Sequence, residues 1–174
     1  SGNDNRPPFL PDLSPKGPII NFKVHDDSKP KPDAPRGNAQ RWEVEDNLVP
    51  DEIFQVNRQF ILYSIPDSLR GAQWVRINPE SFRDKPKDKP IVTFELSEAA
   101  EVYLDSQPDG WEDSGLKAEW VYDYNLPRRE PLYAKIAISE ESLSVRRFEA
   151  GAKVEIPPGF KFLFVKTTGE TDSL

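Results

Sequence analysis

The sequence has no cysteine, no methionine and a single histidine, His25, among its 174 residues. The lack of cysteine excludes a disulfide framework, a thiolate nucleophile and cysteine-ligated zinc. A lone histidine argues against a Ser-His-Asp site or a two-histidine metal site, since either would depend on that one residue. Because methionine is missing even at position 1, we expect a processed product or an excised segment, and Ser1-Gly2 could be an expression scar.

Long apolar runs and an excess of positive charge are also missing. No run approaches the roughly 20 apolar residues that span a bilayer, and no charged-then-apolar signal segment opens the chain. We therefore expect a soluble form without membrane insertion. The chain carries 30 acidic against 23 basic residues, a formal net charge of -7, which argues against nucleic acid as a partner. Its length suits one domain with a real core.

Proline is abundant in residues 1–40, where aromatic residues are scarce. Because proline fixes φ and removes a backbone donor, this stretch is predicted to be an arm or linker. It would either lead in from a preceding domain or pack onto the rest of the chain. Residues 19–24 are the exception and could form a short edge strand with Ile20, Phe22 and Val24 on one face. The prolines are Pro7, Pro8, Pro11, Pro15, Pro18, Pro30, Pro32 and Pro35.

Residues 41–166 show the two-residue alternation of β-strands. Residues 91–97 alternate apolar and polar side chains, and the pattern resumes at 102–104, which predicts an antiparallel hairpin of these two segments. The run 160–166 is apolar on both faces, as expected of a central strand. Further strand-like runs lie at 42–45, 59–65, 74–77, 117–124, 132–138, 143–148 and 153–156.

These runs predict an all-β fold. No segment has a sustained helical period with caps, whereas about nine or ten short strands are separated by turn signals. We predict an antiparallel two-sheet β-sandwich, jelly-roll-like, over residues 41–166, with a proline-rich arm at 1–40 and a polar tail at 167–174. Trp42 and Trp74 are assigned to packing in this sandwich.

An ordered set of short elements between residues 53 and 166 carries a family resemblance. Together they resemble the β-sandwich ancillary module found beside catalytic domains in secreted bacterial polysaccharide-active enzymes such as rhamnogalacturonan lyases. The chain departs from that module at 105–113, where an acidic segment replaces a basic residue and a Pro-Trp-Leu block. The elements are Gln55-Val56-Asn57-Arg58, Ile65 to Ala72, Trp74 to Asn78, Val92 to Leu96, Val102-Tyr103-Leu104, the loop around Trp111, Tyr133-Ala134-Lys135, Gly151 to Val154 and Phe162 to Val165.

The resemblance implies a non-catalytic module of a larger secreted protein. Such a module would be extracellular, periplasmic or at the cell surface, and its partner would be a polysaccharide or a neighbouring domain of the same polypeptide. No cofactor is required. Because the resemblance is weakest at 105–113, it does not transfer a ligand preference.

Two groups of residues could bind a sugar, which needs an aromatic face for its CH surface and polar groups for its hydroxyls. The first is Trp111 with the acidic residues around it, chiefly Asp109 and Asp113. Its ring could instead fold back and plug the end of the sandwich.

The second group is the stripe Trp120, Tyr122 and Tyr124, whose rings would share one strand face at a spacing of roughly 6.6 Å. Such a ladder could line an extended glycan. Aromatic stripes of this kind also serve as core or cross-strand packing.

Calcium is an open alternative, with Asp105, Asp109 and Asp113 as oxygen ligands, although their spacing is not that of an EF-hand loop.

The sequence leaves three functions open. The first is a non-catalytic module that binds polysaccharide through aromatic and acidic residues. The second is a structural or protein-interaction domain that docks onto a neighbouring domain or subunit. The third is a small polysaccharide-active enzyme that uses paired carboxylates.

Overall fold

The computed structural model describes residues 17–25, 41–56, 58–122 and 138–168. These residues form an all-β fold of two antiparallel sheets, as predicted. Two short 3-10 turns at Asp67–Leu69 and Pro79–Phe82 flank β4. The strands are β1 (Ile19–Val24), β2 (Glu43–Glu45), β3 (Phe60–Ser64), β4 (Gln73–Arg76), β5 (Val92–Leu96), β6 (Ala100–Leu104), β7 (Glu112–Tyr122), β8 (Ser139–Phe148), β9 (Lys153–Ile156) and β10 (Leu163–Thr167).

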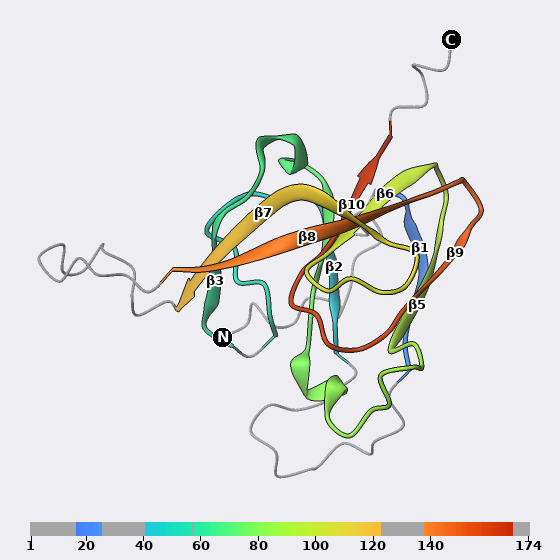
Figure 1. The fold of residues 1–174 in the computed structure, drawn as a ribbon, viewed down its shortest axis with the longest axis horizontal. Coiled ribbons are helices and arrows are strands. Elements are labelled where there is room, and N and C mark those ends of the chain that lie inside the picture. Colours follow the sequence, from blue (N-terminus) through green and yellow to red (C-terminus); the bar gives the residue numbers. More distant parts are fainter. Residues whose placement is uncertain (1–16, 26–40, 57, 123–137, 169–174) are drawn as a thin grey trace, which may run out of the picture.

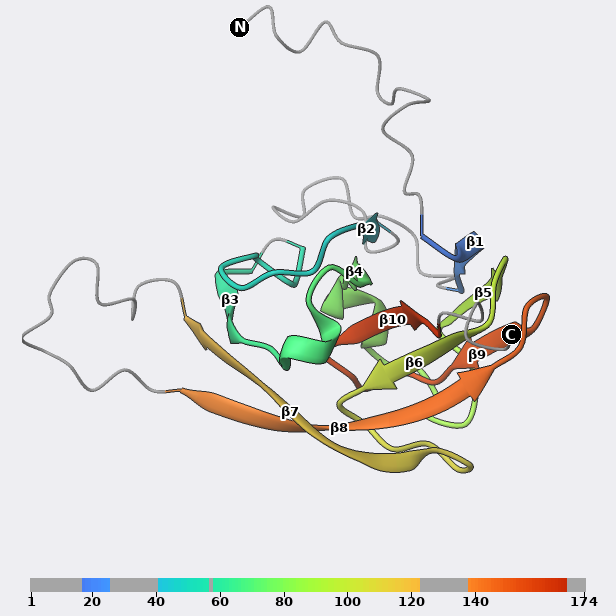
Figure 2. The same ribbon diagram turned by 90° about the horizontal axis from the view of Figure 1, so that it is seen from above.

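The two sheets differ in size and curvature. The smaller has the order β1-β5-β9, and the larger has the order β2-β4-β10-β6-β8-β7-β3 (Figure 1). Figure 2 shows the larger sheet curling, with the long β7–β8 ribbon passing beneath β10 and β6. β10 lies between β4 and β6, which confirms the prediction of a central strand near the C-terminus.

Residues 53–56 close the curl by linking β3, at one end of the larger sheet, to the chain just after β4, next to the other end. Ile53 forms an antiparallel bridge with Ile61 of β3, and Gln55 forms a parallel bridge with Ile77. The Phe54 N–H donates to the Phe60 carbonyl at 3.3 Å. We call residues 51–56, 58 and 59, which include these bridges, the seam.

The curl produces two apolar cores. The first lies between the sheets and contains Val92, Phe94 and Leu96, whose alternation was visible in the sequence. The second fills the inside of the curl and contains Phe54, Trp74 and Phe162. Trp42 packs half-buried against the first core. Both tryptophans assigned to packing are therefore packing residues.

Two local predictions were wrong. The segments 91–97 and 102–104 do not pair as a hairpin, because β5 lies in the smaller sheet between β1 and β9 while β6 lies in the larger sheet. The short turn between them crosses from one layer to the other. β7 begins at Glu112 rather than at 117, because a bulge between Asp113 and Leu116 lets the polar residues pair with β8.

β1 is the edge strand that the sequence suggested, and it pairs with β5. The predicted inward face is only partly right. Asn21 has φ +54°, and the register shifts between Ile20 and Lys23. Ile19 is therefore buried and Ile20 is exposed, while Phe22 and Val24 pack against the first core as predicted.

Some predictions fall outside the described residues. They are the strand at 132–138, the Tyr133-Ala134-Lys135 element, Asn57, Tyr124, and most of the arm and the polar tail. Within the described ranges, no helix is long and apolar enough to cross a membrane.

Candidate functional site

The Trp111 loop is folded onto the domain. The Trp111 side chain belongs to the first core, with 7% of its surface exposed. Its ring meets Phe148 edge-on at 6.1 Å between centroids, and the Trp111 backbone N–H donates to the Pro108 carbonyl at 3.1 Å. Of the two roles that the sequence left open for Trp111, the buried ring fits the plug at the end of the sandwich, because burial of so large an apolar group outweighs exposure.

The Asp105 carboxylate is bonded to the backbone that leads into β10. Its Oδ1 accepts the N–H groups of Lys161 and Phe162 at 2.7 and 2.9 Å. Burial raises the pKa of the Asp105 carboxyl above its usual value, against the opposing effect of these two bonds and of the Lys161 charge. Asp105 therefore fixes the chain where it enters β10.

The three aspartates do not form a calcium site. Asp109 is exposed, and Asp113 accepts the Gly115 N–H at 2.8 Å within the β7 bulge. Across residues 17–25, 41–56, 58–122 and 138–168, no group of three or more His, Cys, Asp or Glu side chains could hold a metal ion. Asp105 serves β10 and Asp113 serves the bulge, so their carboxylates have separate local roles.

The aromatic stripe divides into a buried and an exposed part. Trp120 is half-buried, with its ring 4.9 Å from that of Phe60 and its indole N–H donating to Glu141 at 3.0 Å. Tyr122 has 40% of its surface exposed, and its ring meets Phe60 edge-on at 4.6 Å. Trp120 is thus part of the scaffold, whereas the Tyr122 side chain stays partly exposed.

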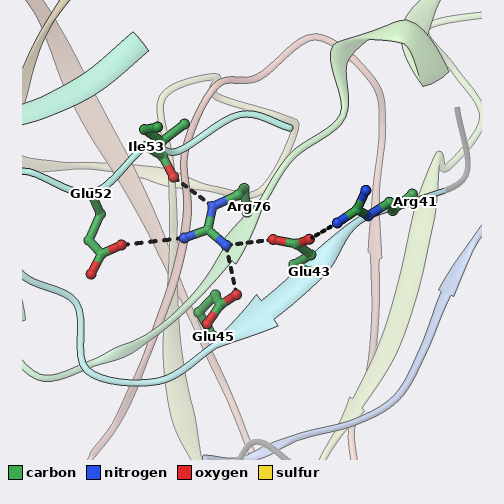
Figure 3. A network of polar contacts seen from close by, with 6 residues as sticks. All are labelled: Arg41, Glu43, Glu45, Glu52, Ile53 and Arg76. Atoms are coloured by element: carbon green, nitrogen blue, oxygen red, sulfur yellow. Dashed lines mark hydrogen bonds and ion pairs between the residues drawn. The ribbon is translucent and has the colours of Figure 1, made fainter. Parts of the chain in front are cut away.

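A polar cluster at the end of β4 was not anticipated from the sequence. The Arg76 guanidinium donates to Glu43 at 2.5 Å and Glu45 at 2.7 Å, both on β2. It also reaches Glu52 at 3.3 Å and the Ile53 carbonyl at 2.6 Å on the seam (Figure 3). We call these five residues the Arg76 cluster.

The Arg76 cluster joins β2, β4 and the seam through the Arg76 guanidinium. Glu43 lies directly opposite Arg76 in the β2–β4 pairing, and the guanidinium lies 4.8 Å from the centre of the Trp74 ring. Arg41 extends the cluster through a 3.0 Å ion pair with Glu43. The alternation of residues 42–45 indicates that Glu43 and Glu45 share a face, but no sequence pattern pairs them with Arg76.

The cluster forms part of the wall of an open cavity of about 620 Å³. Arg58 is tied to Glu80 by a 2.7 Å ion pair. Ile53 has 43% of its surface exposed. The cavity therefore combines amides, carboxylates and guanidinium groups with one open apolar side chain. Its lining residues are Arg41, Glu43, Asp51, Glu52, Ile53, Gln55, Val56, Arg58, Gln59 and Arg76.

Glu43 should make folding stability depend on pH. Burial alone would raise the pKa of its carboxyl, but the Arg76 hydrogen bond and charge, aided by Arg41, outweigh it and lower the pKa. A lowered pKa gives stability that is fully present above about pH 5 and is lost as the pH falls below about 4. We expect Glu43→Gln to flatten the loss of unfolding free energy between these values in urea titrations. An unchanged slope would contradict this, and Glu149→Gln, at an exposed carboxylate, is the matched control.

The cluster favours the ionised form of the Glu43 carboxyl, whose pKa is lowered. A glycosidase general acid needs a raised carboxyl pKa. Glu43 is therefore suited to accept hydrogen bonds and not to act as a general acid.

The fold and these surfaces define a two-sheet β-sandwich domain with a polar cavity on the seam and an exposed tyrosine at the end of β7. No family model matches the sequence, and no curated protein sequence matches it. Among solved structures the chain is similar to a beta-glucuronidase from glycoside hydrolase family 2, with a TM-score of 0.59 and 14% sequence identity. The likeness covers 93% of this chain but only 16% of that protein, and at this identity it shows the fold alone.

Proposed function

We propose that this chain is a non-catalytic module of a larger secreted protein that acts on polysaccharides, and that the module binds carbohydrate. The observation that carries the proposal is the fold likeness, because 93% of the chain matches a segment making up 16% of a glycoside hydrolase. The motif resemblance between residues 53 and 166 supports the same class independently. Fold alone does not assign function, so the site must be tested.

Binding would act through local concentration. A module tethered to a catalytic domain keeps that domain near its substrate, and the gain comes from effective concentration without any new chemistry. This role suits a secreted, periplasmic or surface protein with an insoluble or dilute substrate.

Tyr122 is the aromatic platform that best supports this function. Its exposed ring is held edge-on by Phe60, so little side-chain freedom is lost when a sugar ring stacks on it. Trp111 is buried and Trp120 is half-buried. The loop carboxylates of Asp109 and Asp113 are exposed and could accept hydrogen bonds from sugar hydroxyls.

Affinity electrophoresis against pectic, algal and hemicellulosic polysaccharides tests the proposal. We expect at least one polysaccharide to retard the protein. Tyr122→Ala should weaken that retardation by about tenfold, since an aromatic contact contributes about 1–1.5 kcal/mol. Tyr63→Ala is the matched control, because Tyr63 is similarly exposed on β3.

Each other outcome has a defined meaning. Failure of every polysaccharide to retard the wild-type chain would contradict carbohydrate binding. Loss of binding with a chelator would favour the calcium alternative. Release of sugar products in the same panel would favour the enzyme alternative.

Docking onto a neighbouring domain is the second candidate. Tyr122 and Ile138 are both exposed, and the Trp120–Ser139 pairing places them at the same end of the β7–β8 ribbon. Large apolar groups gathered at one end of a domain are typical of interfaces. In the full-length protein, Tyr122→Ala would then loosen the neighbouring domain, as measured by proteolysis, without any glycan present.

A further inference from the structure

We propose that the seam cavity binds a neutral sugar residue through its hydroxyl groups, with the Gln55 amide as the central contact. This inference rests on the proposed carbohydrate-binding function and assigns it a site. Neither the predicted Trp111 loop nor the predicted aromatic stripe contains this cavity.

Gln55 provides the main argument. The residue has 5% of its surface exposed, yet its side-chain amide makes no hydrogen bond to any described residue, and it lines the cavity. Among the described residues, the fully buried side-chain polar atoms without a partner are Trp74 Nε1 and Ser106 Oγ, so the Gln55 amide still reaches the open cavity. One amide presents both a donor and an acceptor to adjacent hydroxyls.

Two further polar groups share the cavity. Asp51 and Gln59 line it, and the side chains of both make no hydrogen bond or ion pair with the described part of the chain. Asp51 is held with φ +75°, and its N–H donates to the Leu62 carbonyl at 2.8 Å. An amide and a carboxylate on a backbone anchored to β3 form a preorganised set of hydroxyl partners.

The charge of the cavity favours a neutral ligand. Its lining contains three guanidinium groups and three carboxylates. Arg76 is paired with three carboxylates of the Arg76 cluster (Figure 3), and Arg58 pairs with Glu80. Asp51, whose carboxylate has no ion pair with the described residues, would repel a uronate or sulfate group. The ligand is therefore best matched by hydroxyl groups.

The cavity has little apolar surface. Ile53 offers an exposed aliphatic side chain, and none of the described residues that line the cavity is aromatic. Its volume of about 620 Å³ lies within the usual range for small-ligand sites. Without a stacking ring we expect weak binding of a single sugar residue, with a dissociation constant on the order of 1 mM.

Isothermal titration calorimetry of the whole chain with neutral oligosaccharides tests the assignment. Gln55→Met preserves length and removes both hydrogen-bonding groups, so we expect affinity to fall about tenfold or more. Wild-type affinity should change less than about twofold between about 50 and about 500 mM salt. Gln107→Met, in the Trp111 loop, is the matched control and should bind as the wild type does.

The outcomes separate this inference from the function on which it rests. Gln55→Met keeps the length of the side chain and removes an amide that makes no hydrogen bond to the described residues, so its melting temperature should stay close to that of the wild type. If Tyr122→Ala loses binding while folded Gln55→Met binds normally, the cavity assignment is wrong and the module function stands. If the wild type binds no glycan, both are wrong. Preference for uronate-bearing glycans, with affinity falling steeply in salt, would overturn the neutral-ligand assignment.

Discussion

Trp111→Ala is expected to lower the free energy of unfolding by about 3–5 kcal/mol, the usual cost of removing a buried aromatic side chain from a core. The residue is 7% exposed and packs against the first core beside Phe148. Its removal leaves a cavity at the end of the sandwich that the Pro108 turn cannot fill. Urea unfolding followed by circular dichroism measures the change.

The same variant distinguishes a plug from a binding platform. At a temperature where Trp111→Ala is still folded, we expect its glycan affinity to stay within about twofold of the wild type, since the ring is not open to solvent. Tyr122→Ala is the converse control, with a small loss of stability and a large loss of binding. A stable Trp111→Ala protein that no longer binds glycan would show that the loop opens to its ligand.

Arg76→Ala is expected to lower the free energy of unfolding by about 2–4 kcal/mol. Removing one partner of a buried ion pair typically costs about 3–5 kcal/mol, and the 19% exposure of the Arg76 side chain reduces this through solvent screening. Three carboxylates would be left facing one another, and the seam would lose the side-chain contacts that Arg76 makes with Glu52 and the Ile53 carbonyl. Urea unfolding at neutral pH measures the loss.

A double-mutant comparison isolates the electrostatic part of this effect. Arg76→Lys keeps the charge but cannot reach four acceptors at once, so it should lose less stability than Arg76→Ala. Adding Glu45→Gln to Arg76→Ala should recover part of the loss, because one of the repelling charges is removed. A change below about 0.5 kcal/mol for Arg76→Ala would mean that the cluster is a solvated surface pair of little energetic weight.

Most strands could be predicted because side-chain alternation is a local property. The strand β5 is predicted by the alternation of Val92, Phe94 and Leu96 alone, and its partner strands are not needed for this prediction. Their pairing could not be predicted in the same way. The short turn after Leu96 is compatible with a hairpin, and only competition for partners places β1 and β9 beside β5 and sends β6 into the other sheet.

The candidate site was predicted less well than the fold. The sequence identified Tyr122 as one member of a stripe, but could not tell that Trp120 would turn its N–H to Glu141 or that Trp111 would be buried. A loop tryptophan beside acidic residues has the same local pattern whether it plugs a core or binds a ligand. The difference depends on the space left between the two sheets.

The sequence by itself determined that this chain is an all-β sandwich rich in polar surface, because period-two alternation, proline, glycine and the absence of cysteine act locally along the chain. Only the tertiary structure decided that Arg76 meets Glu43, Glu45 and Glu52, and that the Gln55 side chain, which makes no hydrogen bond to the described residues, lines a cavity. The physical reason is sequence separation. Burial and charge pairing belong to groups that lie far apart in the chain and meet only when the larger sheet curls and residues 53–56 close it.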